Sequence, residues 1–311
     1  MSLYQRLQNA NTPKRLDTAG RLVDGMCGTN TSANRAFLGV CEEVIAAEGA
    51  LETPGDESLP RWEFPAHNSA LLINIHPRVR GFLGAIKRAP QARTIIDAGT
   101  GSSALLAVGA AVMHPRAEVT AYEINEPAAR CARAVVGLMG LANRIDVQVA
   151  DVITTPLPKV DLAVTETFAS GLLAEKGLEI TEALARTAKE ILPAYGVLYA
   201  CDETVSSDTR WQHASTVNFA LPNSQLSGRL RSTNGGNRAV YVYAGYYDAR
   251  EDPILAQPGS NNLTFPVHLG SVTVPGAGAN IDFSYAAGSE LHQQPAALWT
   301  PGAPALAAPH L

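Results

Sequence analysis

Apolar positions follow two alternating spacings through the middle of the chain. Short apolar runs predict buried strands at residues 94–97, 118–123, 145–149, 161–165 and 196–201. Apolar residues at helical spacing predict the intervening helices at 102–113, 126–139 and 181–192. Strands that alternate with helices in this way are typical of an α/β protein whose parallel sheet carries helices on both faces.

The patterns on either side of this region differ from it. Residues 1–60 predict a helical N-terminal segment, and a further helix begins near Pro77 and ends at Pro90. After residue 201, two strands at 226–232 and 239–247 flank a glycine-rich turn and predict a β-hairpin. Short strands at 263–268, 271–274 and 281–285 extend this β-rich region. We therefore expect a helical segment (1–60), a Rossmann-like domain (61–201) and a β-rich, barrel-like domain for substrate binding or dimerisation (202–311).

The composition of the chain limits the kinds of partner and the cellular location that we expect. The 311 residues are 46% hydrophobic and 17% charged, as in ordinary globular proteins, and the net charge of −5 argues against nucleic acid as a partner. No apolar run approaches the roughly 20 residues that span a bilayer, and the N-terminus does not resemble a signal peptide. The four cysteines are scattered, which favours reduced thiols over metal ligands. We expect a cytoplasmic protein with no membrane segment and no metal.

The segment Asp97-Ala98-Gly99-Thr100-Gly101 lies between a predicted strand and a predicted helix. Glycines at such a turn let the backbone approach a ligand closely. A dinucleotide site would carry a third glycine where this chain has Ala104. The carboxylate of Asp97 would repel a pyrophosphate but attract the ammonium group of an amino acid. These features favour S-adenosylmethionine as the cofactor over a nicotinamide dinucleotide.

Two further carboxylates end the next two strands. Glu123 is placed to accept hydrogen bonds from ribose hydroxyls, and Asp151 is placed to meet the adenine amino group. With the glycine-rich turn they resemble the class I methyltransferase pattern. The resemblance implies that their neighbours Ile124 and Val152 also contact the cofactor. The alternative is that Asp97 and Glu123 cap helices or form surface ion pairs, and that Asp151 belongs to a turn.

Glu166 follows the strand at 161–165, and a loop that contains Phe168 and Gly171 leads on to Glu175. This stretch resembles the protein arginine methyltransferase family, which has a Glu-to-Glu loop of the same length with an aromatic residue and a glycine. The resemblance implies that Glu166 and Glu175 are catalytic and that, with Phe168, they bind the substrate. It also implies a seven-stranded core, a homodimer, and a role for Arg78 in gripping the carboxylate of the cofactor's methionine part.

A guanidinium group suits a pair of carboxylates. It is planar and always charged, and it donates paired N–H bonds to carboxylate oxygens. Two carboxylates can fix its plane and localise positive charge away from the nitrogen that attacks the methyl group. Two alternatives stay open: Glu175 as a solvated residue in the first turn of a helix, and Arg78 as an exposed charge.

The chain also departs from that family. Its nearest counterpart to the family's Thr-His-Trp loop is Leu298-Trp299-Thr300, which lacks the histidine, so Trp299 is a candidate substrate contact. No helical dimerisation arm is visible after Cys201. A compact β-rich region and an acidic net charge suit a small substrate. In this respect the sequence resembles bacterial enzymes that methylate free L-arginine in nitrosourea (streptozotocin-type) antibiotic biosynthesis.

We therefore expect methylation of a guanidino group, with L-arginine as the favoured substrate. Other hypotheses are methylation of protein arginine, methylation of another amine or of a hydroxyl with Glu166 as a general base, and a cofactor-binding regulatory protein without turnover. A nicotinamide-dependent dehydrogenase is a more distant alternative.

Overall fold

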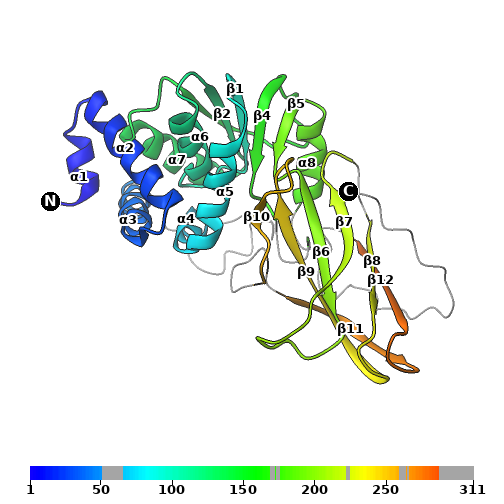
Figure 1. The fold of residues 1–311 in the computed structure, drawn as a ribbon. Helices are drawn as coiled ribbons and strands as arrows, with labels where there is room; N and C mark the ends of the chain where they lie inside the picture. Colours follow the sequence, from blue (N-terminus) through cyan, green and yellow to red (C-terminus); the bar gives the residue numbers. More distant parts are fainter. Residues whose placement is uncertain are drawn as a thin grey trace.

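The structure is a computed structural model, and it describes residues 1–50, 66–168, 172, 176–221, 225–258, 264 and 266–286. The chain begins with three helices, α1 (Leu3–Gln8), α2 (Thr12–Cys27) and α3 (Thr31–Ala47). Figure 1 shows them as an outer layer at one end of the molecule, where α2 contacts α5 and α6, and α3 contacts α7. The predicted N-terminal helices are thus confirmed up to residue 50, and residues 51–60 lie outside the described residues.

Each of these helices begins at a polar side chain. Ser2 forms a capping box with Gln5, and the side chains of Asn11 and Asn30 accept hydrogen bonds from the first turns of α2 and α3. Such caps satisfy backbone N–H groups that have no partner within the helix. The next elements are α4 (Ala66–Leu71), the 3₁₀ turn η1 (Leu72–Asn74) and α5 (His76–Arg88), which confirms the helix predicted near Pro77.

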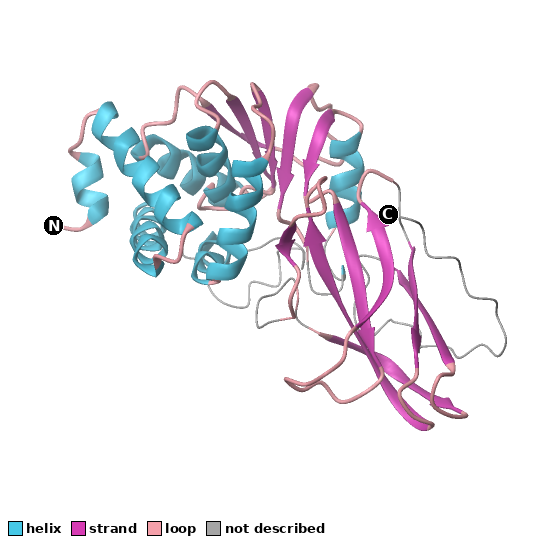
Figure 2. Cartoon of the chain, viewed as in Figure 1, coloured by secondary structure: helices cyan, strands magenta, loops and turns pink. Residues whose placement is uncertain are grey.

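A five-stranded sheet forms the centre of the first lobe (Figure 2). Its strands are β1 (Thr94–Ala98), β2 (Glu118–Glu123), β3 (Ile145–Val149), β4 (Val160–Thr165) and β5 (Ala188–Leu192). They are all parallel, in the order β3-β2-β1-β4-β5. Helices α6 (Leu105–Met113) and α7 (Glu126–Leu138) pack on one face, and α8 (Gly177–Ala185) contacts β4 and β5 on the other. Ile95 and Ile96 accordingly belong to different apolar clusters.

One prediction about this sheet is wrong, and the expected number of strands is not fully confirmed. The stretch 181–192 is not one helix, because α8 ends at Ala185 and 188–192 forms the edge strand β5. Its residues are good helix formers, but pairing with β4 decides their conformation. The described part of the chain also gives the parallel sheet five strands where seven were expected.

The second lobe, here called the β lobe, is confirmed as β-rich. One sheet contains β6 (Tyr195–Cys201), β7 (Gln212–Asn218), β9 (Gly236–Tyr247), β10 (Pro253–Leu255) and β11 (Val267–Val274). Strands β8 (Gln225–Arg231) and β12 (Asn280–Ala286) pair with each other. Figure 1 shows these strands extending away from the parallel sheet on the side where β10 meets α5.

Strand pairing in the β lobe corrects three expectations. The strand at 196–201 exists, but as β6 it pairs with β7 and β9 and not with the parallel sheet. We therefore propose that the β lobe starts at Tyr195 and not at residue 202. The predicted hairpin is wrong, because β8 pairs with β12 while β9 pairs with β6, β10 and β11. Strand β11 is continuous from 267 to 274, with an irregularity at His268–Gly270 where a break was expected.

One apolar core links the two lobes. Its buried members extend from Leu7 in α1 to Phe283 in β12. In the part of the chain that the structure describes, no helix has the length and apolar character needed to cross a membrane.

His114, at the end of α6, is buried inside the first lobe and only 1% exposed. Its Nδ1 accepts a hydrogen bond from the backbone N–H of Ala92 at 3.2 Å. We therefore place the ring proton on Nε2, which donates to the carbonyl of Ile86 at 3.1 Å. Burial lowers the pKa of His114 below its ordinary value.

The protein should therefore lose stability as the pH falls below about 6.5, since the unfolded chain binds a proton at His114 before the folded chain does. One proton limits this loss to about 1.4 kcal/mol per pH unit. Urea denaturation should show a weaker pH dependence in His114→Gln than in wild type. His213→Gln, at an exposed histidine of β7, should follow wild type. Equal pH slopes in wild type and His114→Gln would show that His114 is not responsible.

Candidate functional site

Strand register brings three predicted residues to one edge of the sheet. Ala98 of β1 pairs with Tyr122 of β2 on one side and with Thr165 of β4 on the other. The next residues, Gly99, Glu123 and Glu166, therefore lie at the same level at the carboxyl ends of adjacent strands. The chain order reverses here, because β2 and β4 lie on opposite sides of β1. This is the position where open α/β sheets bind ligands.

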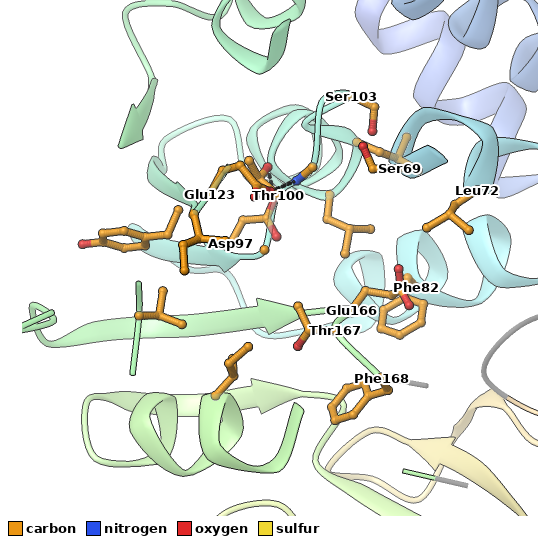
Figure 3. A pocket seen from close by; sticks show the side chains of 18 of the residues that line it. Ser69, Leu72, Phe82, Asp97, Thr100, Ser103, Glu123, Glu166, Thr167 and Phe168 are labelled. Carbon is orange, nitrogen blue, oxygen red and sulfur yellow. Dashed lines mark hydrogen bonds between the residues drawn. The ribbon is translucent and has the colours of Figure 1, made fainter. Parts of the chain in front are cut away.

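A pocket occupies this edge (Figure 3). The structure brings together there all nine residues predicted for the cofactor: Arg78, Asp97, Gly99, Thr100, Gly101, Glu123, Ile124, Asp151 and Val152. Two residues predicted for the substrate, Glu166 and Phe168, also line it. Glu175 and Trp299 lie outside the described residues, and their roles stay predictions.

Asp97 is the most deeply buried carboxylate of the pocket, at 1% exposure. Its Oδ2 accepts hydrogen bonds from the Thr100 hydroxyl at 2.6 Å and from the backbone N–H of Ala107 at 3.0 Å. Burial raises the pKa of Asp97 to about 7, although these two hydrogen bonds oppose the shift. A carboxyl group with this pKa changes its charge near neutral pH, within reach of a ligand.

The turn after β1 requires glycine. Gly99 and Gly101 have φ of +73° and +63°, in the left-handed region. A Cβ at Gly99 would lie 2.3 Å from Cγ2 of Thr167, so the turn also passes too close to the β4 loop for a side chain. Ala104 adopts φ of +46° at the start of α6, so the residue in place of a third glycine has a conformation that glycine would adopt more easily.

Glu123 holds the turn in place. Its Oε2 accepts a hydrogen bond from the backbone N–H of Gly101 at 2.8 Å, and its Oε1 accepts one from Asn125 at 3.0 Å. Both carboxylate oxygens of Glu123 therefore accept a backbone N–H, and the side chain lines the pocket. Asp151 forms a local turn in which Oδ1 accepts the N–H of Ile153 at 2.9 Å. This is the turn geometry considered from the sequence, at a residue that also lines the pocket.

Arg78 and Glu166 form a buried ion pair inside the pocket. Arg78 Nη2 donates to Glu166 Oε2, and the two side chains are only 7% and 14% exposed. The alternative of an exposed Arg78 is therefore wrong. The other oxygen of Glu166, Oε1, is also buried and accepts no hydrogen bond from any described residue. A buried carboxylate that holds one guanidinium N–H, with a second oxygen open, is suited to a further cationic donor.

Phe168 connects the pocket to the β lobe. Its ring lies 5.1 Å from Phe219 and 5.1 Å from Tyr246, between centroids, and is 2% exposed. Aromatic contacts of this kind fix the orientation of all the rings involved. Phe168 is only two residues after Glu166, so the loop that carries this carboxylate is packed against the β lobe close to the pocket.

Several lining residues were not predicted from the sequence. Ser69 on α4 reaches the glycine-rich turn, where its hydroxyl contacts that of Ser102 at 2.9 Å and accepts the Ser102 N–H at 3.1 Å. Phe82 of α5 also lines the pocket. The other unpredicted residues are Leu72, Ile73, Val79, Ser103, Leu105, Leu106, Tyr122, Ala150, Ile153, Thr167, Lys176 and Ile180. Most are apolar, and nothing in the sequence distinguishes them from ordinary core residues.

The charges of the pocket indicate the kind of ligand that fits. Its described lining contains the carboxylates Asp97, Glu123, Asp151 and Glu166 but only two cations, Arg78 and Lys176. Such an acidic lining suits a ligand with positive groups and opposes a pyrophosphate. The lining thus fits a cationic nucleoside such as S-adenosylmethionine, which carries a sulfonium, an ammonium and no phosphate.

The comparisons with known proteins show a shared fold. No protein-family model matches the chain, and no curated protein sequence matches it. Among solved structures, it has the fold of protein arginine methyltransferases.

Three of these structures illustrate the similarity. The Trypanosoma brucei PRMT1 enzyme–prozyme heterotetrameric complex with AdoHcy has a TM-score of 0.54 at 14% identity, over 66% of this chain and 83% of that one. Arabidopsis thaliana protein arginine methyltransferase 10 has a TM-score of 0.54 at 16% identity, over 72% and 88%. PRMT6 has a TM-score of 0.52 at 10% identity, over 68% and 92%. At these identities the likeness establishes the α/β fold with its separate β lobe, and function depends on the residues of the pocket.

Proposed function

We propose that this protein is an S-adenosylmethionine-dependent methyltransferase that methylates a guanidino nitrogen. The observation that carries the proposal is the buried carboxylate of Glu166, which already binds the guanidinium of Arg78 and lines the same pocket as Asp97 and Glu123. Two structures with this fold, the T. brucei complex and PRMT6, were solved with AdoHcy or SAH, the product form of that cofactor.

The residues at the edge of the sheet would hold the cofactor. Glu123 would accept hydrogen bonds from the ribose hydroxyls, Asp151 from the adenine amino group, and Asp97 would attract the ammonium group. Arg78 would bind the carboxylate of the methionine part. When bound, S-adenosylmethionine supplies an electrophilic methyl group on a sulfonium centre.

Glu166 would bind and orient the acceptor. Its buried carboxylate can accept two N–H groups of a guanidinium and fix the plane of that group. We propose that Glu175 supplies the second carboxylate, as the family resemblance implies. Together they would concentrate positive charge on the bound nitrogens and leave the third nitrogen more nucleophilic. Positioning and electrostatics would then contribute most of the rate enhancement.

We favour free L-arginine, or a related small guanidine, over protein arginine. The support is the chain's net charge of −5 together with the missing Thr-His-Trp sequence. Phe168 and Trp299 are the further substrate contacts that we propose. A homodimer, a cytoplasmic location and a role in antibiotic biosynthesis stay predictions.

Two measurements test this function. S-adenosylhomocysteine should raise the melting temperature while NAD should not, because a ligand that binds only the folded state stabilises it. Labelled S-adenosylmethionine should then transfer its methyl group to free L-arginine more efficiently than to related guanidines or arginine-rich peptides. Stabilisation by NAD but not by S-adenosylhomocysteine would contradict the proposed cofactor. Transfer to the peptides alone would contradict the proposed substrate.

A further inference from the structure

One stripe of α5 connects the pocket to the β lobe. Arg78, Gly81, Ala85 and Arg88 follow one another at spacings of three, four and three residues, so they lie along one face of the helix. Arg78 is at the pocket end, where it pairs with Glu166. Gly81 and Arg88 contact the β lobe, as described next. The same rigid helix thus connects β lobe contacts to a residue of the proposed cofactor site.

Gly81 permits an unusually close contact with β10. A Cβ at this position would lie 2.0 Å from the carbonyl oxygen of Ile254 and 3.0 Å from its carbonyl carbon. Because both of these are backbone atoms, a side-chain rotation cannot relieve the collision. Gly84, one turn further along α5, differs: its Cβ would meet only Nη1 of Arg88, at an ordinary 3.4 Å.

Arg88 anchors the other end of the stripe. Its Nε and Nη2 donate to Oδ2 of Asp248 at 3.2 and 3.0 Å, and Asp248 is 3% exposed. In return, Nη1 of Arg250 donates to the carbonyl of Arg88 at 2.9 Å. Oδ1 of Asp248 accepts the backbone N–H groups of Arg250 and Asp252, each at 3.0 Å. The segment between β9 and β10 therefore grips the end of α5 through both side-chain and backbone atoms.

We propose that Gly81 is a positioning residue: its contact with Ile254 lets the β lobe set how far Arg78 reaches into the pocket. This inference rests on the proposed function, in which Arg78 binds the carboxylate of the cofactor. Relieving the collision of a Cβ with the Ile254 carbonyl requires α5 to move by about 1 Å, and misplacements of this size can cost a large factor in function. Arg78 lies three residues away on the same helix, so its backbone would move with Gly81. That movement would displace the Arg78 side chain within the buried pocket.

The test is the binding of two ligands to Gly81→Ala, measured by calorimetry. S-adenosylhomocysteine contains the amino-acid carboxylate that Arg78 would bind, whereas 5′-methylthioadenosine lacks that whole part. We expect Gly81→Ala to weaken S-adenosylhomocysteine binding about 10-fold, as the loss of one hydrogen bond to a charged group would, and to leave 5′-methylthioadenosine binding unchanged. Gly84→Ala, the matched control in the same helix, should bind both ligands like wild type. A merely structural defect would weaken both ligands together, and that result would overturn the proposal.

A double-mutant cycle gives a second criterion. Arg78→Ala should lose affinity for S-adenosylhomocysteine only, and adding Gly81→Ala should then cause little further loss, because the two changes act through the same contact. Full additivity would overturn the positioning role. If Gly81→Ala does not fold, Arg88→Gln replaces it, and the same selective loss is expected; equal losses for both ligands would again overturn the proposal. Failure of wild type to bind S-adenosylhomocysteine would instead refute the proposed function itself.

Discussion

Glu166→Gln should lower the rate of methyl transfer by about 10²- to 10³-fold while S-adenosylhomocysteine still binds. Glutamine keeps the size of the side chain but removes the negative charge that would hold a guanidinium. Its amide nitrogen is also a donor, which would face the N–H groups of the acceptor. Arg78 would lose its ionic partner in the pocket but, in the proposed complex, would still bind the carboxylate of the cofactor. Single-turnover transfer from labelled S-adenosylmethionine and calorimetric binding measure the two effects separately.

Glu179→Gln is the matched control for this prediction. Glu179 lies in the first turn of α8, is exposed and does not line the pocket, so its neutralisation should leave the rate unchanged. A Glu166→Gln enzyme with a rate near wild type would show that no guanidinium depends on this carboxylate. An equal loss in both variants would point to the overall charge of the region.

Asp97→Asn should stabilise the protein increasingly as the pH rises from about 4 to about 7. Burial raises the pKa of Asp97 to about 7, so the folded state keeps its proton over a range in which the unfolded chain has lost it. The stability that protonation provides is present at low pH and is lost as the pH approaches 7, whereas asparagine does not titrate. The difference should reach roughly 4 kcal/mol, measured as the difference in the free energy of unfolding at several pH values.

The change in unfolding free energy caused by Asp161→Asn should depend on pH in the opposite direction. The pKa of Asp161 is lowered to about 2, chiefly by the hydrogen bond from Lys189. Its contribution to stability is therefore present at neutral pH and is lost in acid.

Asp97→Asn should also bind S-adenosylhomocysteine about 10- to 100-fold more weakly near pH 8, since it lacks the charge that attracts the ammonium. A stability difference that does not change with pH would contradict the assignment of the buried charge to Asp97.

The carboxyl edge of the sheet could be predicted because it depends on local sequence. The ends of β1, β2 and β4 are marked by Asp97, Glu123 and Glu166, and parallel strands place these ends at one edge whatever the details of packing. The glycine-rich turn could be predicted for the same reason. The conformation at Ala104, where a dinucleotide site would carry a third glycine, could not be predicted. Ala104 is left-handed, which an alanine side chain does not suggest.

Features that depend on long-range pairing could not be predicted. The Arg78–Glu166 pair joins residues 88 positions apart, and the sequence around either residue does not indicate its partner. The segment 188–192 contains helix formers but forms an edge strand, because β4 offers it backbone hydrogen bonds. In the same way, the turn before β9 suggested a hairpin, but β8 pairs with β12, whose residues begin at Asn280.

The aromatic contacts of Phe168 with Phe219 and Tyr246 join the lobes through a continuous interior. A fragment that ended after β5 would leave the Phe168 ring and the inner side of α5 facing water, and the remaining piece would expose Tyr246. The lobes are therefore not interchangeable modules. Engineering that grafts a different β lobe onto the first lobe would have to include the residues that complete its interior.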